Sequence, residues 1–283
     1  MSGARRAGHA PAPDHGARRA GRVPTIFAMG GGGFTMEPGN PALDDYVRTL
    51  APAREPRVCL LPTAGGDSED QIRRFHAAFG DQLCEPTHVS LFRLGSRPVP
   101  LRKHLLAQDV IYVGGGSMVN LLALWRAHGV DDILREAWHA GIVLAGLSAG
   151  STCWFEWGVT RSVGRAGGRE GARLPARLEL CALRREPERR SLYLDAVARG
   201  ELPAGWGVDD GAGLLFRGTR LVEAVASRPS ARAFRVRAVD GRAVEEAIEP
   251  RLLKARPHAD PLAPLAVEEL RALSAARRGL RRA

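Results

Sequence analysis

A chain of 283 residues, 45% hydrophobic and 25% charged, can bury a full core, and one large α/β domain with extensions is the first expectation. No stretch approaches the roughly 20 apolar residues of a membrane helix, and residues 1–22 lack the apolar centre of a secretory signal, so we expect a cytoplasmic protein. Three segments, 1–22, 161–190 and 271–283, have net charges of +4, +5 and +5, which leave the rest of the chain at −4. Without interleaved aromatic residues, these arginine-rich segments do not favour nucleic acid as a partner.

The two ends of the chain differ in composition from its body. Residues 1–22 consist mostly of Gly, Ala, Pro and Arg without an apolar period, which predicts a disordered tail. We expect the α/β domain to span residues 23–250 and a basic extension to occupy 251–283, with one helix at 266–278. The four cysteines form no CxxC pair, so we expect neither a metal site nor a disulfide framework, and no cofactor.

From residue 24 onward, short apolar runs alternate with helix-like patterns. Asn40 before Pro41 marks one helix start, and Ser68 followed by Gln71 three residues later forms a capping box at another. This alternation predicts an α/β fold with a doubly wound, mostly parallel sheet and helices on both faces. The expected strands are 25–29, 58–61, 87–92, 109–113 and 142–145, and the expected helices start at 41 and 68 or span 101–108, 117–128 and 131–139.

Two further features concern turns. Residues 231–239 and 242–248 flank Asp240 and Gly241, which predicts a C-terminal β-hairpin that extends the sheet. The run Gly30 to Gly33 follows the first strand, but it lacks the spacing and the lysine of a phosphate-binding loop. Nucleotide binding there is therefore a less favoured alternative.

The sequence Gly146-Leu147-Ser148-Ala149-Gly150 matches G-x-S-x-G, a sharp strand-to-helix turn that lifts a serine side chain above a sheet. A strand precedes it and a helix-capable run, residues 149–157, follows it, as the motif requires. Gly146 and Gly150 are expected because the strained turn packs its backbone closely against neighbouring elements. Ser148 is thus the candidate nucleophile.

A serine nucleophile also needs hydrogen-bond donors for the developing oxyanion. The preceding strand ends in Gly114, Gly115 and Gly116, whose backbone amides are candidate donors, and the Ala149 N–H is another. The alternative is that the three glycines form only a flexible turn.

These motifs, VGGGS-x2-NLL followed by GLSAGS-x-CWFEWGVT, resemble the peptidase E (S51) family within the class I glutamine amidotransferase-like superfamily. The similarity extends to EPERR at 186–190 and VDDGAGLLF at 208–216, and so covers about residues 24–248. It implies a Ser-His-acid hydrolase of small acidic or isoaspartyl-type dipeptides, with Ser148 as nucleophile and Gly115, Gly116 and Ala149 as the oxyanion hole. We expect a small peptide as the partner and a monomer or homodimer.

The resemblance fails at the general base. Similar proteins carry the triad histidine as Cys-x-His before the EPERR-like helix, where this chain has Cys181, Ala182 and Leu183, and they often carry Asp where this chain has Arg161. No histidine occurs between residues 139 and 258.

Other residues are poor substitutes for the missing base. His139 is expected at the sheet edge opposite Ser148, and His258 falls in a proline-rich tail. Glu156 is expected on the helix after Ser148 as a surface or capping carboxylate, and Asp209 and Asp210 as turn residues before a strand.

Residues 161–185 also read unlike their surroundings, with frequent arginine and no strand alternation. One hypothesis is a compensated reading-frame slip in GC-rich DNA. The other is a genuine pseudoenzyme that binds a small anionic ligand without cleaving it.

Overall fold

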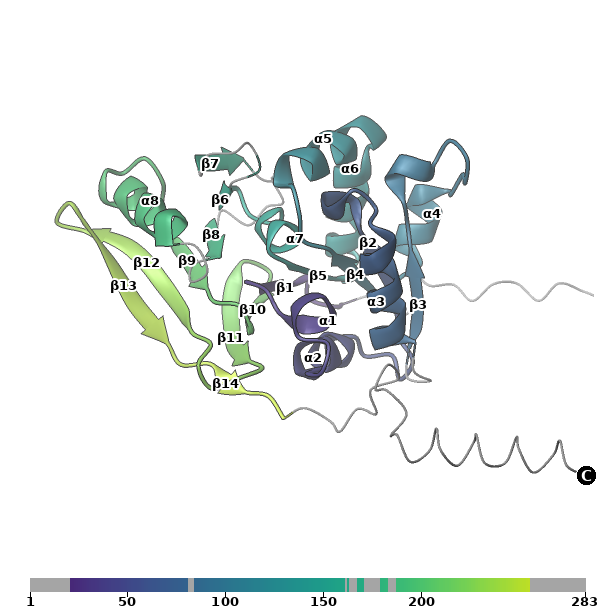
Figure 1. Cartoon of the computed structure of the whole chain (residues 1–283), viewed down its shortest axis with the longest axis horizontal. Coiled ribbons are helices and arrows are strands. Elements are labelled where there is room, and N and C mark those ends of the chain that lie inside the picture. The colour runs from purple at the N-terminus through teal and green to yellow at the C-terminus, as the bar shows by residue number, and fades with distance from the viewer. Residues whose placement is uncertain are drawn as a thin grey trace, which may run out of the picture.

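The computed structural model describes residues 21–80, 84–160, 162, 167–170, 179–182 and 187–254. These residues form two β-sheets with flanking helices (Figure 1). Nearly all of the predicted N-terminal tail lies outside the described residues, as do His258 and the helix predicted at 266–278.

The main sheet has eight strands in the order β14-β11-β10-β1-β5-β4-β2-β3. The run from β1 to β3 is parallel throughout, whereas β10 pairs antiparallel with β1. The carboxyl ends of the parallel strands therefore meet at one edge, where ligands bind in open α/β sheets. In spatial order, the strands are β14 (Arg251–Leu252), β11 (Arg220–Ala226), β10 (Ala212–Arg217), β1 (Thr25–Met29), β5 (Val143–Leu147), β4 (Val110–Val113), β2 (Arg57–Leu61) and β3 (Glu85–His88).

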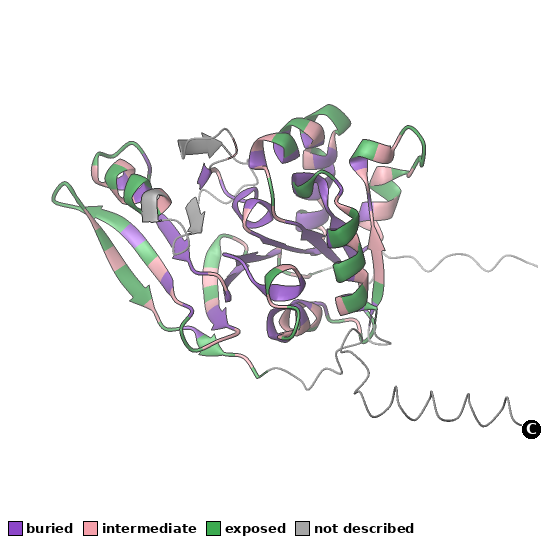
Figure 2. Ribbon diagram, viewed as in Figure 1, coloured by how far each residue is buried: buried purple, intermediate pink, exposed green. Residues whose placement is uncertain are grey.

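Helices cover both faces of this sheet, which confirms the doubly wound prediction. Alternate side chains of β1 enter two separate cores, with Ile26 and Ala28 in one and Phe27 and Met29 in the other. Both faces are apolar, so the central strands are buried throughout (Figure 2). One core includes residues of α1 (Gly33–Met36), α2 (Ala42–Leu50) and α3 (Glu69–Phe79), and the other those of α4 (Leu101–Leu106), α5 (Met118–His128), α6 (Val130–His139) and α7 (Ala149–Thr152).

A second sheet has six strands in the order β13-β12-β9-β8-β6-β7, and helix α8 (Pro187–Ala198) contacts its strands β12 and β13. Tyr193 and Val197 of α8 are buried in a core with Val236 of β12. The strands are β6 (Trp157–Thr160), β7 (Gly167–Glu170), β8 (Glu179–Ala182), β9 (Gly205–Val208), β12 (Ala233–Val239) and β13 (Arg242–Ile248).

The predicted C-terminal hairpin is present as β12 and β13. Asp240 and Gly241 both have positive φ, 49° and 73°, as a two-residue type I′ turn requires. The expectation that this hairpin extends the main sheet is wrong, because β12 pairs with β9 of the second sheet. The main sheet is instead extended by the hairpin of β10 and β11, which the sequence pattern did not reveal.

Several predicted boundaries also differ. The strand expected at 87–92 ends at His88 and is followed by a 3-10 turn, Leu91–Arg93. The N-cap of α2 is Pro41, although Asn40 Oδ1 still accepts the Ala42 N–H at 3.3 Å. The helix expected at 149–157 ends at Thr152, because the chain turns there to bury Trp154 and Phe155 before β6.

The segment 161–185, expected to lack strands, contributes β7 and β8. Strand β8 pairs in parallel with both β6 and β9, so backbone pairing on two sides places it in the sheet. Tertiary pairing of this kind does not require side-chain alternation in so short a strand.

Candidate functional site

Ser148 occupies a sharp turn between β5 and α7. Its φ of 52° and ψ of −118° lie in a region that residues with a side chain rarely adopt, and its N–H donates to the Met29 carbonyl of β1 at 3.1 Å. Every other residue between Gly141 and Phe155 is buried. The turn therefore lifts this one side chain out of the packed sheet at the carboxyl edge, as the sequence motif predicts.

The glycines on either side of Ser148 allow the turn to pack directly against neighbouring backbone atoms. A Cβ added to Gly146 would lie 2.5 Å from the Gly150 carbonyl carbon. One added to Gly150 would lie 2.6 Å from the Val113 carbonyl carbon and 2.7 Å from the Gly114 oxygen. No side chain fits at these distances, so both positions require glycine.

The three glycines after β4 lie beside Ser148. A Cβ on Gly115 would be 3.4 Å from the Ser148 Cβ. The Gly115 carbonyl lies on the opposite side, 3.4 Å from where a Gly65 Cβ would be. Because the carbonyl and N–H of a trans peptide point in opposite directions, the Gly116 N–H points toward the β5 side of the loop, where Ser148 lies.

The backbone amides around Ser148 are available to a ligand. In the described part of the chain, the N–H groups of Gly115 and Gly116 donate to no backbone carbonyl. Ala149 is the first residue of α7, where an N–H has no acceptor within its helix. The structure thus brings together the six residues predicted for the site: Ser148, Gly115, Gly116, Ala149, Gly146 and Gly150.

The histidines within the described ranges make their contacts elsewhere. His76 Nε2 and His88 Nδ1 are 2.9 Å apart, and His104 Nε2 lies 3.3 Å from Thr87 Oγ1, on the β3 side of the sheet. Burial lowers the pKa of all three imidazoles. His139 ends α6 just before β5 begins, at the edge opposite Ser148, as expected.

The acidic candidates have structural roles. Glu156 lies between α7 and β6, so the expectation that it sits on the helix after Ser148 is wrong. Asp209 and Asp210 lie between β9 and β10, where Asp209 Oδ2 accepts the Arg232 N–H at 3.0 Å. The positions of Arg161 and Leu183, where the acid and the histidine were expected, lie outside the described residues.

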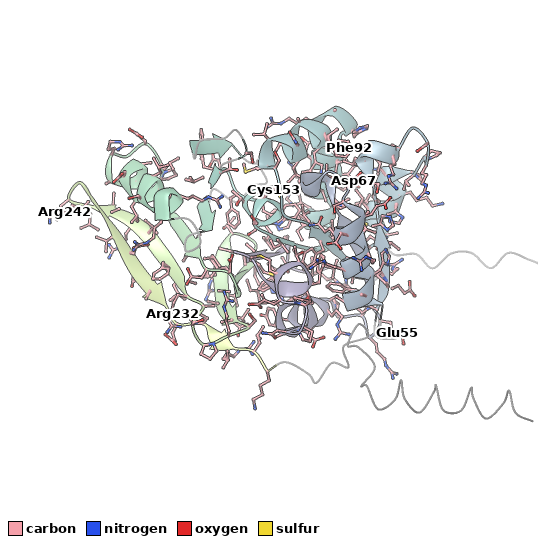
Figure 3. All side chains as sticks on the ribbon, in the orientation of Figure 1. Glu55, Asp67, Phe92, Cys153, Arg232 and Arg242 are labelled. Atoms are coloured by element: carbon pink, nitrogen blue, oxygen red, sulfur yellow. The ribbon has the colours of Figure 1, made fainter. Side chains whose placement is uncertain are left out.

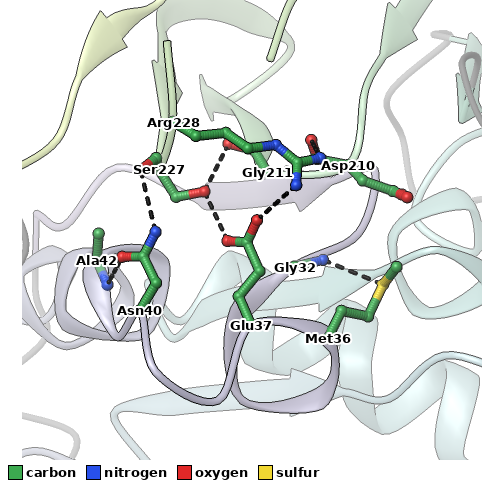
Figure 4. Close-up of polar contacts among 9 residues, drawn as sticks. All are labelled: Gly32, Met36, Glu37, Asn40, Ala42, Asp210, Gly211, Ser227 and Arg228. Atoms are coloured by element: carbon green, nitrogen blue, oxygen red, sulfur yellow. Dashed lines mark hydrogen bonds and ion pairs between the residues drawn. The ribbon is translucent and has the colours of Figure 1, made fainter. Parts of the chain in front are cut away.

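The glycines after β1 pack against the chain itself, and Gly30 to Gly33 are all buried. Figure 4 shows Glu37 at the centre of this region, 3.1 Å from Arg228 and accepting the Ser227 hydroxyl at 2.7 Å. Arg228 also donates to the Asp210 carbonyl at 2.6 Å. This network fills the loop and gives no support to the nucleotide alternative.

A second loop borders the site on the β2 side. Asp67 has a φ of 55° and is buried, and its Oδ2 accepts the Phe92 N–H at 2.9 Å (Figure 3). Burial raises the pKa of the Asp67 carboxyl. Phe92 is 55% exposed. Sequence reasoning missed this pair because nothing in the pattern shows that Asp67 is buried.

Sequence reasoning also missed Asp44, a carboxyl buried below the glycines after β1. A Cβ on Gly33 would lie 3.3 Å from Asp44 Oδ2, and neither carboxylate oxygen makes a well-formed hydrogen bond within the described residues. Burial raises the Asp44 pKa to about 8, against a smaller lowering effect of the Phe34 backbone. The nearby Asp44 also raises the pKa of the buried Tyr112 phenol, after the larger effect of burial itself.

The described residues include neither a metal-binding cluster nor a membrane-spanning helix. No three His, Cys, Asp or Glu side chains gather there in a way that could hold a metal ion. Within the same ranges, no helix has the length and apolar character needed to span a membrane.

Comparison with known proteins gives consistent results. The model of Peptidase family S51 matches residues 26–223. The chain is 45% identical over 217 residues to the uncharacterized peptidase YgaJ of Bacillus subtilis (strain 168), covering 75% of this chain and 91% of that protein.

Two solved structures share the fold. A peptidase from an acI-B1 Actinobacterium matches with a TM-score of 0.61 and 18% identity, covering 85% of this chain and all of that one. A putative peptidase E from Listeria monocytogenes EGD-e matches with a TM-score of 0.53 and 14% identity, covering 72% and 98%. At these identities the likeness concerns the fold alone.

Proposed function

Because the chain belongs to peptidase family S51, we propose that it is a serine peptidase of small acidic or isoaspartyl-type peptides, with Ser148 as the nucleophile. The observation that carries this proposal is the turn at Ser148. It places Ser148, the one residue between Gly141 and Phe155 that is not buried, at the carboxyl edge of the sheet, beside backbone amides that have no acceptor among the described backbone carbonyls. Family membership supports the peptidase activity, and the site geometry supports the choice of residue.

The proposed reaction is acyl transfer in two steps. Ser148 Oγ attacks the scissile carbonyl carbon, and the amides of Gly115, Gly116 and Ala149 donate to the oxygen that becomes negative. The C–N bond then breaks, the leaving amine takes the proton that the Ser148 hydroxyl gave up, and water hydrolyses the ester to release the acid and regenerate the serine hydroxyl.

This mechanism also requires a proton acceptor for the Ser148 hydroxyl. In the described ranges, no imidazole hydrogen-bonds to Ser148, and the sequence has no histidine between residues 139 and 258. Enzymes of this kind lose several orders of magnitude in rate without their base, and the oxyanion hole and substrate binding supply what is left. We therefore expect turnover far below that of an intact triad.

The lack of a base for Ser148 also favours a second candidate function. In this reading the chain is a noncatalytic protein that binds a small anionic ligand. Amides that can stabilise an oxyanion can also bind a carboxylate. Acidic dipeptides would then raise the melting temperature of the protein without being consumed. Resequencing the coding region tests why residues 161–185 lack the expected histidine, because a clean reading frame through this segment would exclude a frame slip.

A fluorophosphonate probe tests the nucleophile directly, because oxyanion donors beside a serine hydroxyl promote its attack on the probe even when no base assists, although the reaction is then slow. We expect labelling at Ser148 that Ser148→Ala abolishes together with any dipeptide cleavage. Ser151→Ala is the matched control, since Ser151 lies three residues further on and is fully buried. Labelling that survives in Ser148→Ala would reject Ser148 as the nucleophile, and stabilisation by acidic dipeptides without labelling would favour the binding protein.

We further propose a cytoplasmic location. Cys59 and Cys153 are buried and form no disulfide, as is usual for proteins of reducing compartments. We also propose a small peptide as the ligand and a monomeric or homodimeric state. Gel filtration with light scattering would test the oligomeric state.

A further inference from the structure

Gln71 lies at the start of α3, directly behind the glycines that border Ser148. Its backbone N–H donates to the N-cap Ser68 Oγ at 3.5 Å, as predicted for a capping box. Its side chain does not complete the box. The carboxamide lies instead against Gly114, on the inward face of α3 that also carries the buried Phe75 and Phe79.

The carboxamide occupies the space that a side chain at position 114 would fill. A Cβ on Gly114 would lie 2.8 Å from Gln71 Cδ and 2.9 Å from Nε2, and closer still to Oε1. Gln71 is 9% exposed, and its Oε1 is buried without a hydrogen-bond partner among the described residues. A buried acceptor without a donor destabilises the fold, so an apolar residue of the same size would be preferred if stability alone mattered.

On its other side, Gly114 is pressed against the turn that holds Ser148. The Gly114 oxygen is 2.7 Å from where a Gly150 Cβ would be, and Gly150 in turn packs against Gly146. The order in space is therefore Gln71, Gly114, Gly150 and Gly146. The carboxamide therefore packs against the glycine that contacts the turn.

Among the described residues, backbone hydrogen bonds hold the two ends of this glycine segment. Gly114 N–H donates to the Leu61 carbonyl at 3.1 Å and Ser117 N–H to the Ala64 carbonyl at 2.7 Å. Between these anchors, glycine is free to adopt many backbone conformations. Filling the space beside Gly114 removes much of that freedom.

We propose that Gln71 is a positioning residue for the oxyanion site: its neutral carboxamide, packed against Gly114, holds the Gly115 and Gly116 amides toward Ser148. This inference rests on the proposed function for its catalytic meaning, although the packing itself does not. Neutrality matters because a negative charge at this position would oppose the charge that develops on the substrate oxygen.

Three substitutions separate volume from charge. Gln71→Met keeps the volume and the neutrality, and we expect labelling of Ser148 at close to the wild-type rate. Gln71→Ala empties the space beside Gly114 and lowers the maximal labelling rate about tenfold with little change in probe affinity, since small misplacements of catalytic groups have effects of this size. Gln71→Glu lowers the maximal labelling rate at least as much at pH 8. This loss of rate diminishes at low pH, because the introduced carboxyl is then protonated.

The matched control is Gln108→Glu. Gln108 is also buried, but it precedes β4 at the opposite edge of the sheet. If Gln71→Glu slows labelling no more than Gln108→Glu does, or if Gln71→Ala labels at the wild-type rate, the proposal is wrong.

Hydrogen exchange gives a readout that does not depend on reaction at Ser148. We expect faster amide exchange in peptides covering residues 113–117 of Gln71→Ala than in the wild type, with exchange in β3 unchanged. Unlabelled wild type would reject the serine peptidase, and the exchange result would still decide the role of Gln71. Unchanged exchange at 113–117 would overturn the positioning role even if the wild type is labelled.

Discussion

The buried carboxyl of Asp44 should make the stability of the protein depend on pH. Its pKa rises from 3.8 to about 8 on folding, chiefly because burial disfavours the charged form. A carboxyl with a raised folded pKa is most favourable to folding below pH 4, and this contribution is lost as the pH rises toward 8. At about 1.4 kcal/mol for each pKa unit, the loss is on the order of 6 kcal/mol above pH 8 and about half of that at pH 6.

Asp44→Asn removes the titration and keeps the shape of the neutral acid. We expect urea unfolding at pH 8 to show the variant more stable than the wild type by several kcal/mol, with the difference falling toward zero at pH 4. Asp132→Asn is the control, because Asp132 occupies the first turn of α6 but is exposed, and its substitution should change stability by less than about 1 kcal/mol. A constant difference between Asp44→Asn and wild type from pH 5 to pH 8 would refute the reasoning.

Two further predictions concern packing and the paired histidines. Gly150→Ala should destabilise the protein by about 2 kcal/mol or more, because its Cβ would overlap backbone atoms of β4, whereas Gly95→Ala, with open space around it, should be close to neutral in thermal melts. His88 has a pKa lowered from 6.5 by burial and next by the charge of His76, so stability should fall as the pH drops below 6.5. His88→Asn should flatten that decline between pH 7 and pH 5 in urea titrations, and an unchanged slope would contradict the assignment.

The parts of the site that could be predicted are those encoded in neighbouring residues. The turn at Ser148 follows from five consecutive residues after an apolar strand, and the parallel sheet follows from alternating apolar runs and helix signals. Parallel strands then bring the ends of β4 and β5 to one edge, so the proximity of Gly115 to Ser148 could also be inferred.

What could not be predicted depends on burial and long-range pairing. Asp44 and Asp67 look like ordinary helix and turn residues in the sequence, and only the packed structure shows them enclosed. Gln71 matches a capping box locally, yet its side chain is placed by Gly114, which is more than forty residues away in the sequence. Strand β8 was missed for the same reason, because its neighbours in the sheet, rather than its own residues, determine it.

The glycine contacts between the turn and its neighbouring loop bear on any attempt to engineer this protein. The contacts here are between the backbones of Gly114, Gly146 and Gly150. Because these residues have no side chains, no side-chain substitution at them can make the reaction centre slightly wider or narrower. New substrate preferences must therefore be sought at the periphery, at exposed positions such as Phe92. A library restricted to such outer positions would explore selectivity while leaving the reactive geometry untouched.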